Sequence, residues 1–429
     1  MKRNPIRTHI KISMSFINKH ASSRASRMKI LLAVLALCAL STDAQAQAPA
    51  LYDAPARLVV KSKVLGEDRT IVVRTPAGYE RDGARYPVLY MTDGDAHIQH
   101  TSGTVEFLAR NGRVPEMIVV GITNTDRTRD LTPTNVAQTL PNGTTQPTTS
   151  GGADNFLKFI ETELMPLVES RYRVQPYRLL AGHSLGGLFA IHTMMSRPEL
   201  FNAYIAVSPS LQWDNQVLVK RAEQFFTGRK EFKKTLFFTL GNEPDPIAAG
   251  FKNFGELLAR YKPEGFVWES VRLEDEDHGS VVLRSHYMGL RKAFDGWLLA
   301  FNQQTGEVVG GLKGAEEHYK NLSQKVGYPV PVPEGLVNRI GYQLVAAGKL
   351  EDAIVVFKSN VERYPASANV YDSLGEAYET QGRLDLARPN YEKAYALGKD
   401  AKDPNLAIYK ANVDRVSEKL KQNGATGSK

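Results

Sequence analysis

The stretch Gly182-His183-Ser184-Leu185-Gly186-Gly187 decides the fold. It contains the pattern G-x-S-x-G, directly after the β-type run Tyr177–Ala181 and at the start of a helical stretch over Leu185–Ser196. A strand, a tight turn and a helix in that order form the setting of a nucleophile elbow, where glycines leave room for a strained turn. The sequence therefore predicts a serine nucleophile, Ser184, at the carboxyl edge of a parallel sheet, where open α/β sheets bind ligands.

Short β-rich runs alternate with helical stretches from Arg57 to about Asn302, and several runs are continuously apolar. Such runs are typical of strands buried on both faces of a mostly parallel sheet. The expected strands are Leu58–Val64, Thr70–Arg74, Val88–Thr92, Met117–Thr123, Arg178–Ala181, Ala203–Val207, Thr235–Leu240 and Val267–Leu273. The expected helices are Thr104–Arg110, Asn155–Ser170, Leu185–Ser196, Gln216–Phe226, Ile247–Tyr261 and His286–Asn302. The alternation predicts an α/β fold with helices on both faces of the sheet.

A serine hydroxyl becomes a nucleophile at neutral pH only when a base takes its proton, and we expect that base to be His278. It follows the last expected strand, 94 residues after Ser184, on a loop at the same sheet edge. An acid should stand between the two, and the strand Thr235–Leu240 is followed by Glu243 and Asp245. We prefer Glu243, which is closer to the strand end; Asp245, or a dyad without an acid, is the alternative.

The oxyanion that forms when an ester is attacked needs backbone N–H donors, and a helix N-terminus supplies free ones. We expect the first donor to be Leu185, directly after the nucleophile. The second donor is expected in the turn after the third strand, from Gly94 or Asp95.

The same turn allows an alternative, a metal site. Its ligands would be Asp93, Asp95, His97 and His100. One short cluster without further ligands is weak support for a metal site, so we expect neither a metal nor an organic cofactor. Of the other helical histidines, His192 is expected to be a packed or surface residue, and His286 and His318 are expected to lie on helix surfaces.

Five separated segments of residues 57–300 resemble the esterase branch of the α/β-hydrolases, which includes esterase D, feruloyl esterases and the esterases that open trilactone siderophores. The segments are Val88–Asp95, Arg127–Pro133, Ala181–Gly187, Ser208–Trp213 and Glu276–Val281. The resemblance implies that Ser184 is the nucleophile and His278 the base. It also implies that Arg127–Pro133 and Trp213 line the cleft, which the polar segment Asn124–Gly152 is expected to overhang. The expected substrate contacts are Arg127, Arg129, Asp130, His183 and Trp213.

Residues 1–46 are typical of a secretory signal peptide. Basic residues precede the apolar run Ile30–Leu40, which is too short to span a bilayer, and Ala44-Gln45-Ala46 is an A-x-A cleavage pattern. A lipoprotein alternative would use Cys38, the only cysteine, but Leu37 stands where a lipobox has Gly or Ala. The sequence therefore predicts a periplasmic or secreted protein without stable membrane insertion.

The formal charge of +8 is concentrated in this leader. Eight of the 54 basic and one of the 46 acidic residues lie in 1–46, which leaves 46 basic and 45 acidic residues over 47–429. This balance gives no electrostatic reason to expect a nucleic-acid partner. With no cysteine after residue 46, we expect no disulfide and no cysteine nucleophile in the mature chain.

The chain after the α/β domain (47–302) contains a connector (303–333) and an internal repeat (334–421), followed by a tail (422–429) expected to be disordered. The connector should hold one amphipathic helix, Ala315–Lys325, and a stiff proline-rich segment. Residues 34 positions apart match: Gly341 and Gly375, Leu350 and Leu384, Ala353 and Ala387, Phe357 and Tyr391. This period is that of the tetratricopeptide helix–turn–helix unit, and Pro404–Leu420 should form a capping helix. Such a module would bind a peptide or protein partner.

These observations together predict an exported serine hydrolase that cleaves carboxylic esters of a small molecule or a polysaccharide through an acyl-enzyme on Ser184. One alternative is an acyltransferase of the same fold. Another is a non-catalytic protein that uses only the helical repeats to bind a peptide. The sequence does not identify the ester, because fold and mechanism alone do not fix a substrate.

Overall fold

The computed structural model describes residues 55–80, 83–140 and 142–426. The predicted signal peptide and Cys38 lie outside these residues. Within them, no helix is long and apolar enough to cross a membrane.

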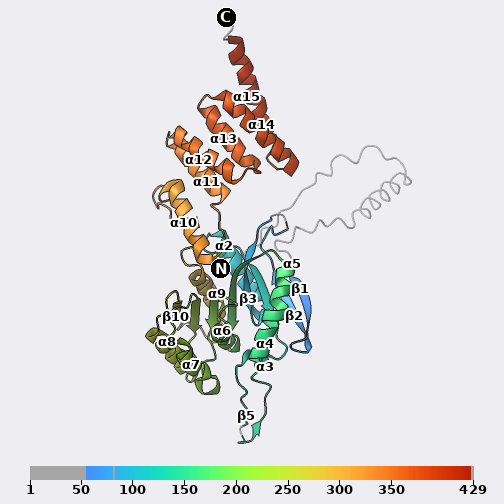
Figure 1. Cartoon of the computed structure of the whole chain (residues 1–429), viewed down its shortest axis with the longest axis vertical. Coiled ribbons are helices and arrows are strands. Elements are labelled where there is room, and N and C mark those ends of the chain that lie inside the picture. The colour runs from blue at the N-terminus through green and yellow to red at the C-terminus, as the bar shows by residue number, and fades with distance from the viewer. Residues whose placement is uncertain (1–54, 81–82, 141, 427–429) are drawn as a thin grey trace, which may run out of the picture. The chain divides into compact units, whose positions relative to one another are not determined.

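One eight-stranded sheet organises the α/β domain, with the strand order β1-β2-β4-β3-β7-β8-β9-β10 (Figure 1). β2 pairs antiparallel with both β1 and β4, and all other neighbours are parallel. The strands are β1 Ala56–Ser62, β2 Glu67–Arg74, β3 Tyr86–Met91, β4 Ile118–Ile122, β7 Val174–His183, β8 Ala203–Val207, β9 Thr235–Leu240 and β10 Val267–Arg272. The predicted fold class is confirmed: this is the mostly parallel sheet of an α/β-hydrolase.

Alternate residues of the central strands enter two separate hydrophobic cores, because successive side chains of a strand point to opposite faces. Leu179 and Phe237 lie in the core beneath α2 and α9, whereas their neighbours Leu180 and Phe238 lie in the core beneath α4 to α8. These helices are α2 Gly94–Arg110, α4 Ala153–Phe159, the π-helical turn η1 Ile160–Leu164, α5 Met165–Arg171, α6 Leu185–Ser196, α7 Trp213–Phe226, α8 Ile247–Arg260 and α9 Val281–Ala293. Both faces of the sheet are therefore covered, as continuously apolar strands require.

Two helix boundaries differ most from the predicted ones. α2 begins at Gly94, ten residues before the predicted start, so the turn after β3 is only Thr92 and Asp93. α9 ends at Ala293 rather than near residue 302, and Gly296 adopts a left-handed φ of 80° shortly after it. A left-handed glycine is a common way to terminate a helix.

The segment Asn124–Gly152 is not a plain loop. It starts with the short helix α3 (Arg127–Leu131) and continues into a hairpin of two short strands, β5 (Gln138–Thr139) and β6 (Thr145–Gln146). The hairpin projects from the domain as a thin finger (Figure 1).

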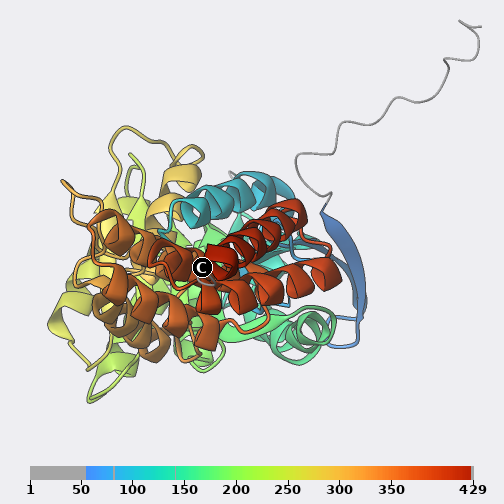
Figure 2. The ribbon, with the colours of Figure 1, turned by 90° about the horizontal axis from the view of Figure 1, so that it is seen from above.

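The C-terminal part is entirely helical in the described residues that follow the connector helix α10 (Gly311–Val326). Its helices are α11 Glu334–Ala346, α12 Leu350–Arg363, α13 Ala368–Thr380, α14 Leu384–Ala401 and α15 Leu406–Thr426. Short turns join successive helices into packed pairs (Figure 2). A Cβ on Gly341 would lie 2.4 Å from the Phe357 ring, and one on Gly375 would lie 2.9 Å from the Tyr391 ring, so the repeated glycines admit repeated aromatic rings.

The expectation of a disordered tail from residue 422 is wrong for its first residues. α15 continues to Thr426, so residues 422–426, predicted to begin a disordered tail, are helical. The tetratricopeptide assignment itself stays a prediction.

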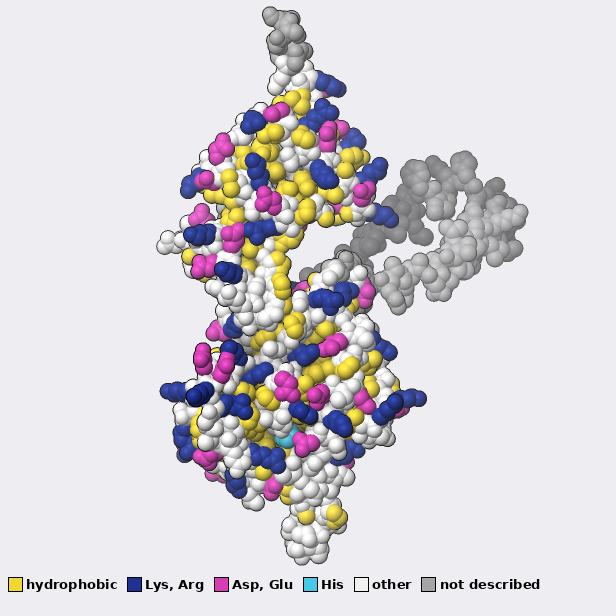
Figure 3. All heavy atoms as spheres, in the orientation of Figure 1, with side chains coloured by type: hydrophobic (Ala, Val, Ile, Leu, Met, Phe, Trp, Pro, Cys, Tyr) yellow, Lys and Arg dark blue, Asp and Glu magenta, His cyan; other side chains and the backbone are white. Residues whose placement is uncertain are grey.

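Lysines and arginines are mixed with aspartates and glutamates over the visible face of the molecule (Figure 3). This mixture matches the near-balance of charge over residues 47–429.

Candidate active site

The elbow at Ser184 has the strained geometry that its glycines predict. Ser184 lies between β7 and α6 with φ 61° and ψ −116°, a conformation that costs energy for any residue with a side chain. A Cβ on Gly182 would lie 2.2 Å from the Gly186 carbonyl oxygen, and one on Gly186 would lie 2.2 Å from Thr92 Oγ1. Only glycine fits at position 182, where the contact is with backbone, and a side chain at position 186 would require Thr92 to move.

The Ser184 hydroxyl lies 3.3 Å from the hydroxyl of Ser210, which is buried. Two backbone bonds hold the elbow against the end of β8: Ser184 N–H donates to the Val207 carbonyl, and Ser210 N–H to the Ser184 carbonyl. Among the hydrogen bonds of the described residues, none joins Ser184 to His278. Catalytic hydrogen bonds in unliganded enzymes are often long and tighten when substrate binds.

His278 pairs with Glu243, the preferred acid. His278 Nδ1 lies 2.7 Å from Glu243 Oε2, and the Glu243 side chain is 3% exposed while that of His278 is 41% exposed. An ionised carboxylate only accepts, so Nδ1 carries the proton and Nε2 is left as the basic nitrogen. Asp245, the alternative acid, is exposed and makes no recorded contact with His278.

The pair stabilises opposite charges on its two members. The hydrogen bond to Glu243 raises the pKa of His278 above its ordinary value, against a smaller opposing effect of burial. Burial would raise the pKa of Glu243, but hydrogen bonds from His278 and Ser208 outweigh it, so the pKa is lowered. Glu243 is therefore a carboxylate at neutral pH and favours the imidazolium that forms when His278 accepts a proton.

Two helix N-termini meet at the elbow. Leu185 is the first residue of α6, so its N–H has no acceptor within the helix. α2 begins at Gly94 and Asp95, directly after β3, which is the parallel neighbour of β7. The three residues predicted as oxyanion donors thus stand at adjacent strand ends, where two positive helix-dipole ends favour a developing negative charge.

Arg127 ties the β3–α2 turn to the elbow. Its Nε and Nη2 donate to the two carboxylate oxygens of Asp93 at 2.6 and 3.1 Å, and Nη2 also donates to the His183 carbonyl at 3.0 Å. Arg127 is one-third exposed, so the predicted contact with substrate would use the part of the guanidinium that these bonds leave free.

Three of the four alternative metal ligands, Asp93, His97 and His100, contact other side chains of the protein. Asp93 is held by Arg127 and Asn124, and His97 Nδ1 lies 3.1 Å from His100 Nε2. The described residues contain no group of three or more potential ligands arranged to hold a metal ion.

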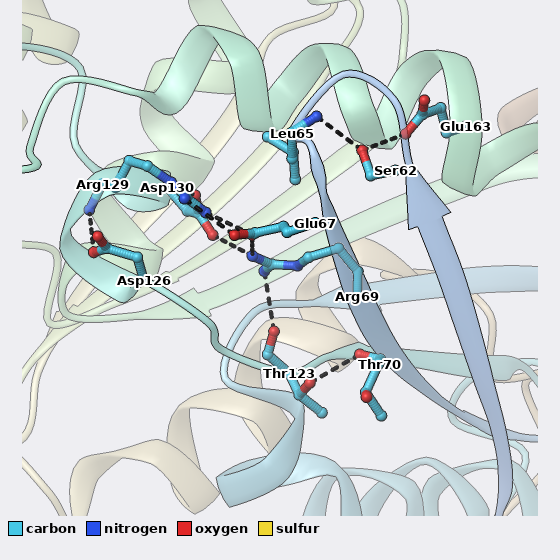
Figure 4. Close-up of polar contacts among 10 residues, drawn as sticks. All are labelled: Ser62, Leu65, Glu67, Arg69, Thr70, Thr123, Asp126, Arg129, Asp130 and Glu163. Atoms are coloured by element: carbon cyan, nitrogen blue, oxygen red, sulfur yellow. Dashed lines mark hydrogen bonds and ion pairs between the residues drawn. The ribbon is translucent and has the colours of Figure 1, made fainter.

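Arg129 and Asp130, predicted to contact substrate, have partners inside the protein (Figure 4). The two carboxylate oxygens of Asp130, which is 2% exposed, accept from Arg69 at 2.6 Å and from Arg129 at 2.8 Å. Glu67 accepts from both arginines and completes the cluster. We therefore assign Arg129 and Asp130 a structural role, in which they attach α3 to β2.

Trp213 stands at the start of α7, and its indole N–H donates to Thr134 Oγ1 at 3.1 Å, at the base of the 124–152 segment. The next three residues, Asp214, Asn215 and Gln216, all have left-handed backbone angles. The place of Trp213 at a substrate cleft stays a prediction.

The sequence interpretation did not identify two neighbours of the elbow, Ser210 and the contact between His183 and the base loop. Ser210 lies in the Ser208–Trp213 segment that carries the family resemblance. The resemblance therefore indicated that this segment is near the active site, but it did not indicate a role for Ser210. His183 Nε2 lies 2.7 Å from the carbonyl oxygen of His278, 95 residues away in sequence, and no local pattern encodes such a contact.

Comparisons with known proteins agree with this geometry. A family model described as "Putative esterase" matches residues 62–248. The chain is 33% identical over 219 residues to the ferri-bacillibactin esterase BesA of Bacillus subtilis, which covers 46% of this chain and 75% of the relative. It is 34% identical over 170 residues to a siderophore enterobactin esterase of Emericella nidulans, which covers 36% of this chain and 55% of the relative.

Among solved structures, an IroE-like serine hydrolase from Shewanella oneidensis superposes with a TM-score of 0.62 at 27% identity, covering 72% of this chain and 99% of the other. The elbow, the sheet order and these matches agree on one family. The chain belongs to this esterase family of the α/β-hydrolases, and it is a carboxylic ester hydrolase.

Proposed function

We propose that this protein is a serine esterase in which Ser184 is the nucleophile and His278 the general base, oriented by Glu243. The observation that carries the proposal is the buried Glu243 carboxylate 2.7 Å from His278 Nδ1, on a loop that contacts the nucleophile elbow. This pairing leaves Nε2 as the only ring nitrogen free to take a proton from Ser184.

In the first half of the reaction, Ser184 Oγ attacks the acyl carbon while His278 Nε2 takes its proton. The oxyanion of the tetrahedral intermediate accepts hydrogen bonds from the Leu185 N–H and from the N–H of Gly94 or Asp95. Its collapse breaks the C–O bond, and His278 returns the proton to the leaving alkoxide.

In the second half, His278 takes a proton from a water molecule that attacks the acyl-enzyme. Collapse of the second intermediate releases the carboxylic acid, and the proton returns to Ser184 Oγ. No step needs a group beyond these side chains and the backbone donors.

The relatives indicate the substrate class. BesA and the Emericella protein are esterases of siderophores, so we propose that this protein hydrolyses the ester bonds of a siderophore-type small molecule. The test is hydrolysis of a catecholate trilactone, with and without bound iron, beside feruloyl and acetyl-xylan esters. Stepwise addition of one water per ester, absent in Ser184→Ala, is the expected result; turnover of the other esters only would contradict the proposed class.

We also propose that the protein is exported and that its helical module binds a partner rather than performing chemistry. The leader composition supports export, and N-terminal sequencing of the mature protein should begin at Gln47. Residues 319–429 contain neither histidine nor cysteine, so that region has no imidazole base and no thiol nucleophile. A mature chain that retains residues 1–46 would contradict export.

A further inference from the structure

His183, the residue before the nucleophile, contacts the loop that carries the base. Its Nε2 lies 2.7 Å from the backbone carbonyl oxygen of His278, and the two imidazole rings are 4.7 Å apart at 46°. Because His183 and Ser184 are consecutive, this contact joins the nucleophile elbow directly to the residue that must accept the nucleophile's proton.

The direction of this hydrogen bond is fixed by chemistry. A carbonyl oxygen only accepts, so His183 must carry its proton on Nε2. Burial, followed by the charge of nearby His278, lowers the pKa of His183 to about 4, so the ring is neutral at neutral pH. A neutral ring beside His278 adds no positive charge that would oppose protonation of the base.

The His183 ring is also held from another side. The ring of His97 in α2 meets it edge-on at 5.7 Å, and His97 Nδ1 lies 3.1 Å from His100 Nε2. His100 stacks on His286 of α9, whose Nδ1 lies 2.9 Å from Thr101 Oγ1. These packed rings limit the rotamers that His183 can adopt.

The base loop needs such an anchor. His278 is half-buried, and most of its neighbours in the loop from Glu274 to Ser280 are exposed. Glu243 holds the side chain of His278 at Nδ1, the Asn242 N–H donates to the Glu276 carbonyl, and the Asp277 carboxylate accepts from the Gly279 and Ser280 N–H groups, but none of these contacts holds the carbonyl of His278 itself. The bond from His183 does.

We propose that His183 is a positioning residue that holds the backbone of His278 against the elbow, so that Nε2 of the base stays within reach of Ser184. This inference rests on the proposed roles of Ser184 and His278. His183 would contact neither substrate nor the transferred proton, which replaces its predicted role as a substrate contact.

The test compares His183→Gln, His183→Asn and His183→Ala in the full chain. A glutamine amide can place its N–H near the former Nε2 position, whereas the asparagine amide is one methylene too short. His318→Ala is the matched control, because His318 Nε2 makes the same kind of bond, to the Trp297 carbonyl at 3.2 Å, in the connector. The readouts are the rate of labelling by a fluorophosphonate, kcat and KM on p-nitrophenyl acetate, and the melting temperature.

We expect the Ala and Asn variants to lose about 10- to 100-fold in kcat and labelling rate, as a misplacement of about 1 Å would cause, with KM and melting temperature nearly unchanged. The Gln variant should recover most of the rate, and His318→Ala should match the wild type. A wild-type rate in the Ala variant, or a Gln variant as slow as Ala, would overturn the proposal, as would loss of folding in the Gln variant.

Labelling of the wild type and of Ser184→Ala shows whether a failure concerns the role of His183 or the proposed function on which that role rests. If the wild type is not labelled, or if Ser184→Ala is labelled equally well, the proposed function fails and the inference fails with it. If only the wild type reacts, the ratio among the His183 variants decides the inference alone.

Discussion

Two buried carboxylates of the α/β domain, Glu243 and Asp130, are held by basic partners in opposite ways. Both oxygens of Asp130 are bound by arginines, and one of these, Arg69, is 1% exposed. Glu243 binds a single imidazole that is 41% exposed and keeps one nitrogen free. A carboxylate with a basic partner on both oxygens stabilises a fold, whereas a pair that leaves one basic nitrogen free can carry out chemistry.

The nucleophile next to the pair of Glu243 and His278 gives the largest expected effect. Ser184→Ala should reduce kcat on p-nitrophenyl acetate by about 10⁴- to 10⁶-fold, since the nucleophile and base act as a unit. The melting temperature should change little, because the substitution keeps the backbone and removes only a hydroxyl with one long contact, 3.3 Å to Ser210. Ser196→Ala at the end of the same helix is the control and should keep full turnover; comparable losses in the two variants would contradict the assignment.

The next largest effect is expected in the pair of Glu243 and His278. Glu243→Gln should reduce kcat by about 10²- to 10⁴-fold, because the amide no longer fixes the His278 tautomer or stabilises the imidazolium. Steady-state kinetics with unchanged KM would show that the loss lies in the chemical step. A drop below tenfold would favour a Ser–His dyad over a triad.

A substitution in the cluster of Arg69, Asp130 and Glu67 should lower the stability of the fold rather than the rate of catalysis. Arg69→Met removes the donor to one buried oxygen of Asp130, while Arg129 still pairs with the other, so it should lower the free energy of unfolding by about 1–3 kcal/mol. Urea unfolding measures the stability, and kcat per folded molecule at low temperature measures the chemistry. A large loss of kcat without loss of stability would show that the cluster belongs to the active site.

The pH profile separates the two pairs further. His278 must be neutral to accept the serine proton, and Glu243 raises its pKa, so kcat/KM should fall with acid through an inflection above 6.5. In Glu243→Gln this inflection should move to lower pH, because the raising hydrogen bond is lost. The same profile in Arg69→Met should match the wild type; an unmoved inflection in Glu243→Gln would contradict the pairing.

The smallest effect is expected at the alternative acid, Asp245. Asp245→Asn should leave kcat within about twofold and stability within about 0.5 kcal/mol, as is usual for an exposed side chain without partners. The kcat and the free energy of unfolding of Asp245→Asn are measured in the same experiment as those of Glu243→Gln. A larger loss in Asp245→Asn than in Glu243→Gln would exchange the roles of the two carboxylates.

The fold could be predicted from the sequence because local rules decide it. Glycines at 182 and 186 are required by close backbone contacts, and the continuously apolar runs of β8 and β9 have the predicted bounds. The start of α2 was missed because Asp93, Gly94 and Asp95 are typical turn residues, and only the close packing of α2 on β4 shows that the helix has already begun.

The site could be predicted only as far as residue types and order allow. Ser184, His278 and Glu243 follow from motif and chain order, but the role of Asp130 depends on Arg69, 61 residues away. Sequence spacing does not encode such a contact, so Asp130 and His183 were both expected to face substrate. Long-range partners decide whether a polar residue is structural or functional.

The most direct test is a crystal structure of the protein after reaction with a fluorophosphonate. The account predicts a phosphonyl group on Ser184 Oγ, an oxygen of that group accepting from the Leu185 N–H, and His278 Nε2 within hydrogen-bond distance while Nδ1 still binds Glu243. A label on another residue, or His278 turned away from the modified serine, would contradict it.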